Sequence, residues 1–409
     1  MSLFWSRLAD QSLLFLVPLV VFDTTGSAAW SGLAFAFEAF PRFLAFPVCG
    51  ALCDRFSPLR LMHYSQAWRA AACVGAAACG AAFGGVEWLV LASVVCGVLT
   101  TQGVMAREVI LPQAFGEYRF EKVLAYAQTA DQLGAVLGPV LAALLMAHLH
   151  WAVALGVTAA GFIGADLALG YWRRRTLSQS RIWLRPGQAG QGILRSMVTA
   201  WGHVARLPAL RRLVVQAAGV NRVVGGTLAS SAALVLGRHG QSASFYGGLQ
   251  ATGAVVTVLV LLCIAHRQVA PWRLGSLGFA AMVVGGALMG LGRGIWPYAA
   301  GYLLVIGFDK MFNIYLRSSR QRVIPVADYG KTTGVMAMLN NLSQPIAGLA
   351  FGAFPAFGAL FGFSDSSRFS GSAAGWGAGA VMVTLTAVMA FLGGLSLWAG
   401  AGPADAAPR

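Results

Sequence analysis

The sequence has 409 residues, of which 57% are apolar and only 11% are charged, and it contains 51 glycines. Soluble globular domains carry about 25% charged residues, so this composition excludes that class and indicates a polytopic membrane protein, in which glycine lets helices approach closely. The formal net charge of +15 would suit a nucleic-acid-binding protein, but the position of the charges along the chain decides what they mean.

Twelve stretches of the chain have the length and composition of a membrane-spanning helix, which needs about 20 mostly apolar residues. The first six are 3–24, 28–52, 61–84, 87–111, 123–148 and 151–172. The second six are 211–236, 243–266, 274–292, 295–317, 332–358 and 375–400. Because Arg7 and Asp10 interrupt the first apolar run, we expect an uncleaved helix there and not a signal peptide.

One basic segment separates the two sets of helices, and a surface helix is compatible with part of it. It contains nine arginines and no acidic residue: Arg173, Arg174, Arg175, Arg181, Arg185, Arg195, Arg206, Arg211 and Arg212. The predicted organisation is therefore an N-terminal six-helix bundle at 1–172, a basic linker at 173–210 and a C-terminal six-helix bundle at 211–409.

The remaining bases alternate between the loops. The loops after the second, fourth, eighth and tenth helices hold Arg55, Arg60, Arg119, Lys122, Arg267, Arg273, Arg320, Arg322 and Lys331, and the opposite loops hold only Arg238, Arg293 and Arg368. Since positively charged loops stay in the cytoplasm, both termini are predicted to be cytoplasmic. The charge is thus a topology signal that also favours anionic lipid headgroups, and it excludes nucleic acid as a partner.

Three short motifs recur in the same order in the two halves. "SAAWSG" (27–32) is similar to "SASFYG" (242–247), "REVILP" (107–112) to "RQRVIP" (320–325), and "LGPVLA" (137–142) to "SQPIAG" (343–348). Internal repeats are common in transporters, so the pattern favours two halves of like orientation. Chance similarity in glycine-rich apolar sequence is the alternative.

A family resemblance follows from "GALCDRFSPLR" between the second and third helices. Gly50, Leu52, Asp54, Arg55 and Arg60 resemble the loop signature of the major facilitator superfamily. Residues 7–35 and 316–348 resemble the branch of that superfamily that includes enterobactin-type siderophore exporters and drug exporters. The resemblance implies an all-α fold of 12 transmembrane helices in two six-helix bundles that alternate between inward- and outward-open states. The second copy of the signature, expected near "AHRQVAPWRLG" (265–275), lacks the Asp-Arg pair.

The resemblance implies a cytoplasmic gate formed by Gly50, Asp54, Arg55 and Arg60. We expect Asp54 to accept hydrogen bonds from the start of the eleventh helix, near Gly330–Thr333, while Arg55 and Arg60 hold acids or lipid phosphate. A charged hydrogen bond contributes about 1.5–3 kcal/mol, enough to bias a balanced equilibrium without freezing it. A tight turn that only anchors the topology is the alternative.

Ionisable residues within the predicted helices mark functional sites by default, because burying them is costly. Four acids are candidates for proton coupling, in this order: Asp10, Glu38, Asp131 and Asp309. Basic and amide residues are candidates for the substrate cavity: Arg7, Arg42, Arg222, Lys310, Asn313, Asn340, Asn341 and Gln344. Arg7 and Asp10 can share a helix face, and Glu38 and Arg42 can pair, whereas Asp309 and Lys310, being adjacent, are expected to have different partners. Structural salt bridges are the alternative.

Two prolines are predicted to kink helices. "GAVLGP" places Gly138 and Pro139 in the fifth helix and resembles a motif of exporters in the superfamily, although Val140 and Leu141 replace its usual small residues. "NNLSQP" places Pro345 among the amides of the eleventh helix. Close packing of helices through small residues is an equal alternative for both segments.

No cofactor or metal site is predicted, and six cysteines without a C-x-x-C spacing indicate neither a disulfide framework nor zinc. "ADYGKTTG" has Pro325 where a phosphate-binding loop needs its first glycine, and "GLGRG" lacks the strand of a dinucleotide site. With no ATP site, any transport is expected to use an ion gradient or the substrate's own gradient.

The sequence thus predicts a monomeric secondary transporter of a bacterial inner membrane, not an enzyme. Its expected partners are a small-molecule substrate, protons and membrane lipids, and its expected activity is export of an amphipathic molecule by proton antiport, with a siderophore as the preferred cargo. The alternatives are a multidrug efflux antiporter or an importer of an anionic small molecule. A membrane enzyme would need a nucleophile–base pair near the interface, and a receptor or scaffold would not need so many buried charges.

Overall fold

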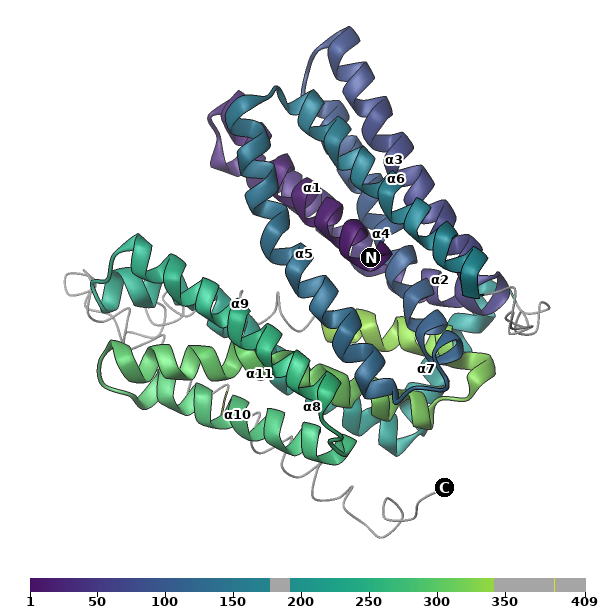
Figure 1. Ribbon diagram of the computed structural model, residues 1–409, viewed down its shortest axis with the longest axis vertical. Helices are drawn as coiled ribbons and strands as arrows, with labels where there is room; N and C mark the ends of the chain where they lie inside the picture. The colour runs from purple at the N-terminus through teal and green to yellow at the C-terminus, as the bar shows by residue number, and fades with distance from the viewer. Residues whose placement is uncertain (177–191, 342–385, 387–409) are drawn as a thin grey trace. The chain divides into compact units, whose positions relative to one another are not determined.

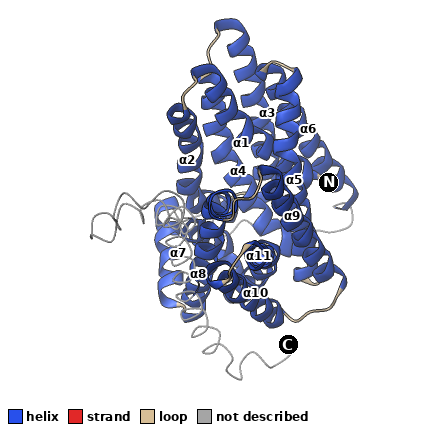
Figure 2. Cartoon of the chain, turned by 90° about the vertical axis from the view of Figure 1, so that its left-hand side faces the viewer, coloured by secondary structure: helices blue, strands red, loops and turns tan. Residues whose placement is uncertain are grey.

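The computed structural model describes residues 1–176, 192–341 and 386, and every regular element in these ranges is a helix (Figure 2). The first half contains six long helices: α1 Ser2–Thr25, α2 Ala28–Arg55, α3 Pro58–Phe83, α4 Glu87–Ala114, α5 Phe120–His148 and α6 Trp151–Thr176 (Figure 1). Each of the six predicted spans of this half is confirmed as a helix, with ends that shift by a few residues.

The second half begins with a short surface helix within the basic linker. Its helices are α7 Ile193–Arg206, α8 Pro208–Ala232, α9 Ala243–His266, α10 Pro271–Leu291 and α11 Ile295–Val323. Residues 233–238 extend α8 as a π-helical turn, and a further helix occupies 329–341, which we call helix 329–341. The predicted twelfth span, 375–400, lies outside the described residues apart from Thr386.

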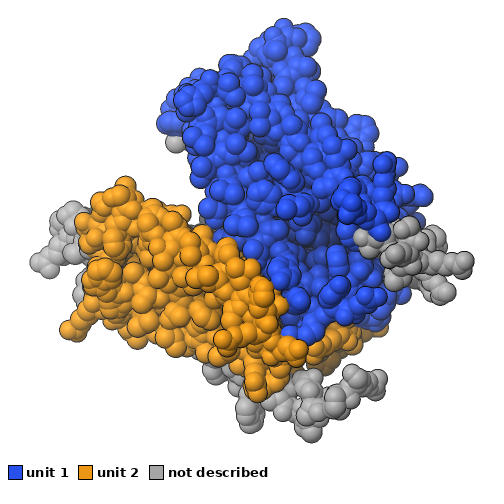
Figure 3. All heavy atoms as spheres, in the orientation of Figure 1, with its two compact units in different colours: residues 1–202, 324–338 blue, residues 203–323, 339–409 orange. Residues whose placement is uncertain are grey.

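The chain divides into two compact units (Figure 3). Unit 1 comprises Met1–Gly202 and Ile324–Met338, and unit 2 comprises His203–Val323 and Leu339–Arg409. Helix 329–341 therefore starts in unit 1 and continues into unit 2. The predicted boundaries at 172 and 210 stay a prediction, because a division by compactness does not locate the ends of a linker.

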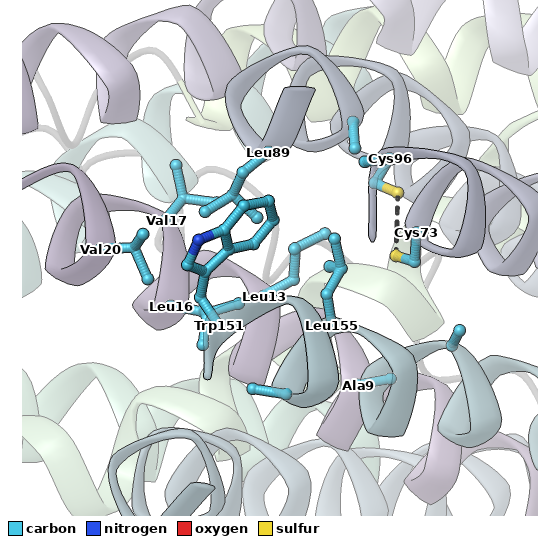
Figure 4. Close-up of a cluster of buried hydrophobic side chains, with 14 of the residues drawn as sticks. Ala9, Leu13, Leu16, Val17, Val20, Cys73, Leu89, Cys96, Trp151 and Leu155 are labelled. Carbon is cyan, nitrogen blue, oxygen red and sulfur yellow. Dashed lines mark hydrogen bonds between the residues drawn. The ribbon is translucent and has the colours of Figure 1, made fainter. Parts of the chain in front are cut away.

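The helices of unit 1 pack around a dry apolar core (Figure 4). Leu13, Leu16 and Val17 of α1 are at most 2% exposed, and they meet Leu89 of α4 and Leu155 of α6 in one cluster. Complete burial of an aliphatic side chain stabilises a fold by about 1.5–3 kcal/mol relative to its exposure to water. The cluster fixes α1 at the centre of the unit, which matters because α1 carries Asp10.

Six described helices are long and apolar enough to cross a membrane. The bent pair of helices 208–228 and 230–237 adds a seventh candidate if the two form one span. Helices α2, α3 and α11 are also long, and they contain the buried charged side chains Glu38, Arg69 and Asp309.

The first repeated motif has the same structural role in both halves. Ser27 caps the N-terminus of α2 by accepting a hydrogen bond from Trp30 N at 3.4 Å, and Ser242 caps α9 in the same way from Phe245 N at 3.2 Å. Serine satisfies an amide that has no partner within the helix, which stabilises the helix start by about 1 kcal/mol. The similarity thus marks an equivalent helix start in each half.

Two glycines of α5 allow its backbone to approach α1 closely. A Cβ atom on Gly134 would lie 2.9 Å from Arg7 Cβ, and one on Gly138 would lie 2.5 Å from Gln11 Cβ. Ser12 Oγ also donates to Gly138 O at 3.0 Å. The contact shows that these glycines serve close packing, while a kink at Pro139, which lies inside α5, stays a prediction.

We predict that Gly138→Ala destabilises the protein by about 1–3 kcal/mol, because the added methyl group overpacks the α1–α5 contact. The thermal midpoint in mild detergent should fall. Gly164→Ala in α6 is the matched control, since a Cβ atom added there would have no other atom within 4 Å, and its midpoint should stay or rise. Equal midpoints for the two variants would contradict the close contact.

Candidate functional site

Three of the predicted acidic residues lie in unit 1, and each pairs with an arginine. Asp10 of α1 accepts from Arg69 Nη1 of α3 at 2.7 Å, and both side chains are less than a tenth exposed. Thr100 Oγ1 of α4 donates to the same carboxylate oxygen at 2.7 Å. Because a carboxylate and a guanidinium neutralise each other here, neither charge remains unpaired in the apolar interior.

Arg69 is held on every side. Its Nε donates to Ser65 O at 3.1 Å, its Nη2 donates to Ser6 Oγ at 3.2 Å, and its guanidinium lies 4.4 Å from the ring centroid of Phe162. Arg69 is not among the site residues predicted from the sequence, although an arginine in the middle of an apolar stretch indicates a functional or paired charge. Arg7 and Asp10, predicted to share a helix face, interact electrostatically, while the ion pair of Asp10 is with Arg69.

Glu38 and Arg42 of α2 form the predicted ion pair, with Arg42 Nη2 donating to Glu38 Oε1 at 2.8 Å. Glu38 is only 2% exposed, and its second oxygen, Oε2, is buried without a hydrogen-bond partner. Gly97 of α4 leaves room for the pair, since a Cβ atom there would lie 3.3 Å from Glu38 Cγ. A half-satisfied buried carboxylate is costly, and such groups mark positions where protonation changes easily.

The third pair joins α4 to α5. Arg107 Nη1 donates to Asp131 Oδ1 at 2.6 Å. Arg107 belongs to the "REVILP" repeat motif, and the sequence analysis gave it no partner. Arg7 lies near the charges of Asp131, Asp10, Arg42 and Arg107, and its Nε is buried without a hydrogen-bond partner. The three ion pairs and Arg7 therefore form one charged cluster.

In unit 2, Asp309 and Lys310 of α11 contradict the prediction that they have different partners. Lys310 Nζ donates to Asp309 Oδ2 at 2.7 Å, and Asn313 Nδ2 donates to Asp309 Oδ1 at 3.1 Å. The helix directs adjacent Cβ atoms apart, but the long lysine side chain curls back to reach its neighbour. Asp309 is buried, while Lys310 is 37% exposed at its side chain.

The other predicted cavity residues lie on α8 and helix 329–341. Arg222 is half-buried, and its neighbour Asn221 donates to Asn340 O at 2.8 Å. Asn340 and Asn341 are also half-buried. Gln344 and Pro345 lie outside the described residues, so their predicted roles in the cavity and the kink stay predictions.

The end of α2 contacts the start of helix 329–341 within unit 1. The backbone N–H of Gly330 donates to Asp54 Oδ1 and that of Lys331 donates to Asp54 Oδ2, both at 2.8 Å. These amides have no partner in the first turn of their helix, and the helix dipole favours a negative charge there. This contact lies where it was predicted, although its function as a gate stays a prediction.

Glycines make this contact possible. A Cβ atom on Gly50 would lie 3.0 Å from Gly330 C and 3.1 Å from Gly334 Cα, and one on Gly334 would lie 3.2 Å from Phe46 C. Nearby, Arg55 is half-buried and Arg60 is exposed. No group of three metal-ligating side chains occurs in the described part of the chain.

Comparison with known proteins agrees with this architecture. The family model of the Major Facilitator Superfamily matches residues 1–348. No curated protein matches the sequence. Among solved structures, the human organic anion transporter MFSD10 (TETRAN) is 16% identical with a TM-score of 0.73, over 97% of this chain and 98% of that chain.

Two further solved structures have a similar fold. A bacterial homologue of the iron transporter ferroportin, in an outward-facing state, is 13% identical with a TM-score of 0.70, over 96% of this chain and 98% of that chain. The proton:xylose symporter XylE is 14% identical with a TM-score of 0.62, over 96% of this chain and 95% of that chain. At these identities the likeness concerns the fold alone.

We predict that Arg69→Met lowers the free energy of unfolding by about 3–5 kcal/mol, because it leaves the Asp10 carboxylate buried without its counter-charge. The double variant Arg69→Met/Asp10→Asn should recover at least half of the loss. Unfolding of the reconstituted protein by denaturing detergent measures both, with Arg60→Met, an exposed arginine at the start of α3, as the control. Additive losses in the double variant would contradict the pairing.

Proposed function

The chain belongs to the major facilitator superfamily, and from this premise we propose that it is a secondary active transporter that exports a small amphipathic molecule by proton antiport and alternating access. The observation that carries the proposal is the charged cluster of unit 1, in which three acid–arginine pairs surround α1. Buried pairs of this kind contribute little net stability compared with apolar packing, so their presence favours a functional role.

Proton coupling requires a carboxylate that can gain a proton without loss of the fold. Among the candidates, Glu38 meets this condition better than Asp10, which the sequence placed first. Glu38 pairs within its own helix and has one oxygen without a partner, whereas Asp10 joins α1 to α3 and α4. We therefore propose Glu38 as the principal proton carrier, with Asp131 and Asp309 as further titrating groups.

The proposed cargo carries negative charge. In the cluster each acid already pairs with an arginine other than Arg7, so Arg7 is the base that an anionic substrate can approach. Arg222 and Lys310 would serve the same purpose in unit 2. A siderophore with carboxylate or catecholate groups fits these bases, and the resemblance of residues 7–35 and 316–348 to siderophore exporters supports that class. Among structures of similar fold, one is described as an organic anion transporter.

Two alternative functions remain within the superfamily. Efflux of cationic or neutral drugs would use the acids as binding groups and is favoured by the second oxygen of Glu38, which is buried without a hydrogen-bond partner. Import of an anionic small molecule would use the same bases in the opposite direction. Fold similarity does not decide between them.

The proposed location is a bacterial inner membrane with both termini in the cytoplasm. The last turns of α6 and α11 carry Arg173, Arg174, Arg175, Arg320 and Arg322. The same side of the membrane would then hold Asp54 and the start of helix 329–341. We propose that this contact closes the cytoplasmic side in the outward-open state.

We predict that Glu38→Gln abolishes uptake driven by a pH gradient in everted vesicles or proteoliposomes while exchange of labelled substrate persists, because the variant cannot release a proton. Candidate substrates are a catecholate siderophore, a carboxylate siderophore and a cationic dye. Asp23→Asn, which alters an exposed carboxylate at the end of α1, is the matched control. Full gradient-driven transport by Glu38→Gln would exclude this residue from coupling, and transport of the dye alone would favour the drug-efflux alternative.

We predict that Asp54→Asn opens the end of α2, because it removes a charged acceptor of two backbone hydrogen bonds. Cys49 and Cys53 lie beside it and are each 4% exposed, so they report the opening by their reaction with maleimide. In a Cys79→Ser/Cys263→Ser background, their labelling rate should rise about tenfold, as a loss of about 1.4 kcal/mol would produce. Glu117→Gln is the control at an exposed acid, and an unchanged labelling rate would eliminate the gate.

A further inference from the structure

Helix α7, Ile193–Arg206, presents a second apolar face that the described part of the chain leaves exposed. Leu194, Val198 and Trp201 are 79%, 71% and 41% exposed, and Ala205 is exposed one turn later. At 100° per residue these four side chains lie within about 60° of one another on the helix. The exposed residues therefore form one continuous stripe, which we call the apolar stripe of α7.

The opposite face of α7 is packed against the protein. Ser196, Ala200 and Val204 are buried, with Ala200 fully inaccessible, and they follow one another at intervals of four residues. The packing of this face places the apolar stripe on the outward side of α7. An exposed leucine alone needs no explanation, but an ordered stripe on a helix fixed by its other face does.

Basic residues border the stripe. Arg195 and Arg206 are exposed and lie on the flank between the apolar stripe and the buried face. No acidic residue occurs between Asp166 and Asp309, so the stripe has only positive charge beside it in the sequence. An apolar face with tryptophan, flanked by arginines, is typical of helices that lie in the plane of a membrane interface.

We propose that α7 lies in the membrane interface, with its apolar stripe inserted among acyl chains and with Arg195 and Arg206 bound to anionic phospholipid headgroups. Helix α6, the preceding described helix, carries three arginines in its last turn, which is typical of a helix end at a cytoplasmic membrane surface. Each such basic residue near a negative surface strengthens the attraction to the bilayer. Held this way, α7 anchors the linker between the two halves to the bilayer.

The test uses the full chain in nanodiscs, with Cys79→Ser and Cys263→Ser removing the two cysteines that are not buried. A fluorescent label is placed at Val198→Cys on the stripe or, as the matched control, at the neighbouring Thr199→Cys on the basic flank. Brominated acyl chains should quench the label at 198 roughly twofold or more strongly than the label at 199. Adding phosphatidylglycerol to phosphatidylcholine should increase the quenching, and Arg195→Gln/Arg206→Gln should remove that increase.

Three results would overturn the proposal. Equal access of aqueous iodide to both labels would show that the stripe faces water. Protection of the label at 198 from iodide and also from brominated lipid would show that protein covers the stripe. Quenching that does not respond to phosphatidylglycerol would remove the anionic headgroup from the assignment. None of these measurements depends on transport, so the proposal and the transport function can fail separately.

Discussion

The structure of unit 1 depends on the rule that a charge buried in an apolar medium must be paired. Asp10, Glu38 and Asp131 each form an ion pair with an arginine at 2.8 Å or less. Two of these pairs join different helices, which could have packed through apolar side chains instead. Removing one partner of a buried pair costs about 3–5 kcal/mol, whereas an apolar replacement of both is often neutral. The pairs therefore restrict which helices can separate: α1 cannot leave α3, and α4 cannot leave α5, without exposing a charge to lipid. A transporter that changes conformation by moving whole bundles needs such internal rigidity.

The three pairs differ in what their disruption would do. Asp10–Arg69 and Asp131–Arg107 join different helices, and Arg69 has further bonds to Ser6 and Ser65. Protonation of those acids would weaken the packing of the bundle. Glu38–Arg42 lies within one helix, where Glu38 packs closely against Gly97, and the ion pair itself joins no two helices. Protonation of Glu38 would therefore leave the contacts between helices in place, as a proton carrier of the cluster requires.

Helix positions were predictable because membrane helices have a simple period and length, and the pairing of Glu38 with Arg42 was predictable because both residues belong to one helix. Partners on different helices were not predictable, since Arg69 and Arg107 reach their acids only through the tertiary arrangement of the helices. Lys310 shows that a prediction about residues of one helix can also be wrong. Rules for adjacent residues describe where Cβ atoms point, but a four-carbon side chain can return to its neighbour when the neighbour is the nearest acid. The contact of Asp54 was predicted correctly because the resemblance to a family motif indicated its distant partner, which residue spacing alone cannot indicate.

The contact at Asp54 combines two features that make it reversible. The glycines at 50, 330 and 334 bring two backbones together without ordering any side chain, so the contact forms with little loss of conformational entropy. The carboxylate then satisfies two amides that would otherwise bind water when the helix end is exposed. Since both the separated and the joined states leave these groups hydrogen-bonded, the free-energy difference between the two states is small. A contact of this kind can be made and broken in each cycle, whereas an apolar core such as that around α1 cannot, because its separation would expose several fully buried aliphatic side chains.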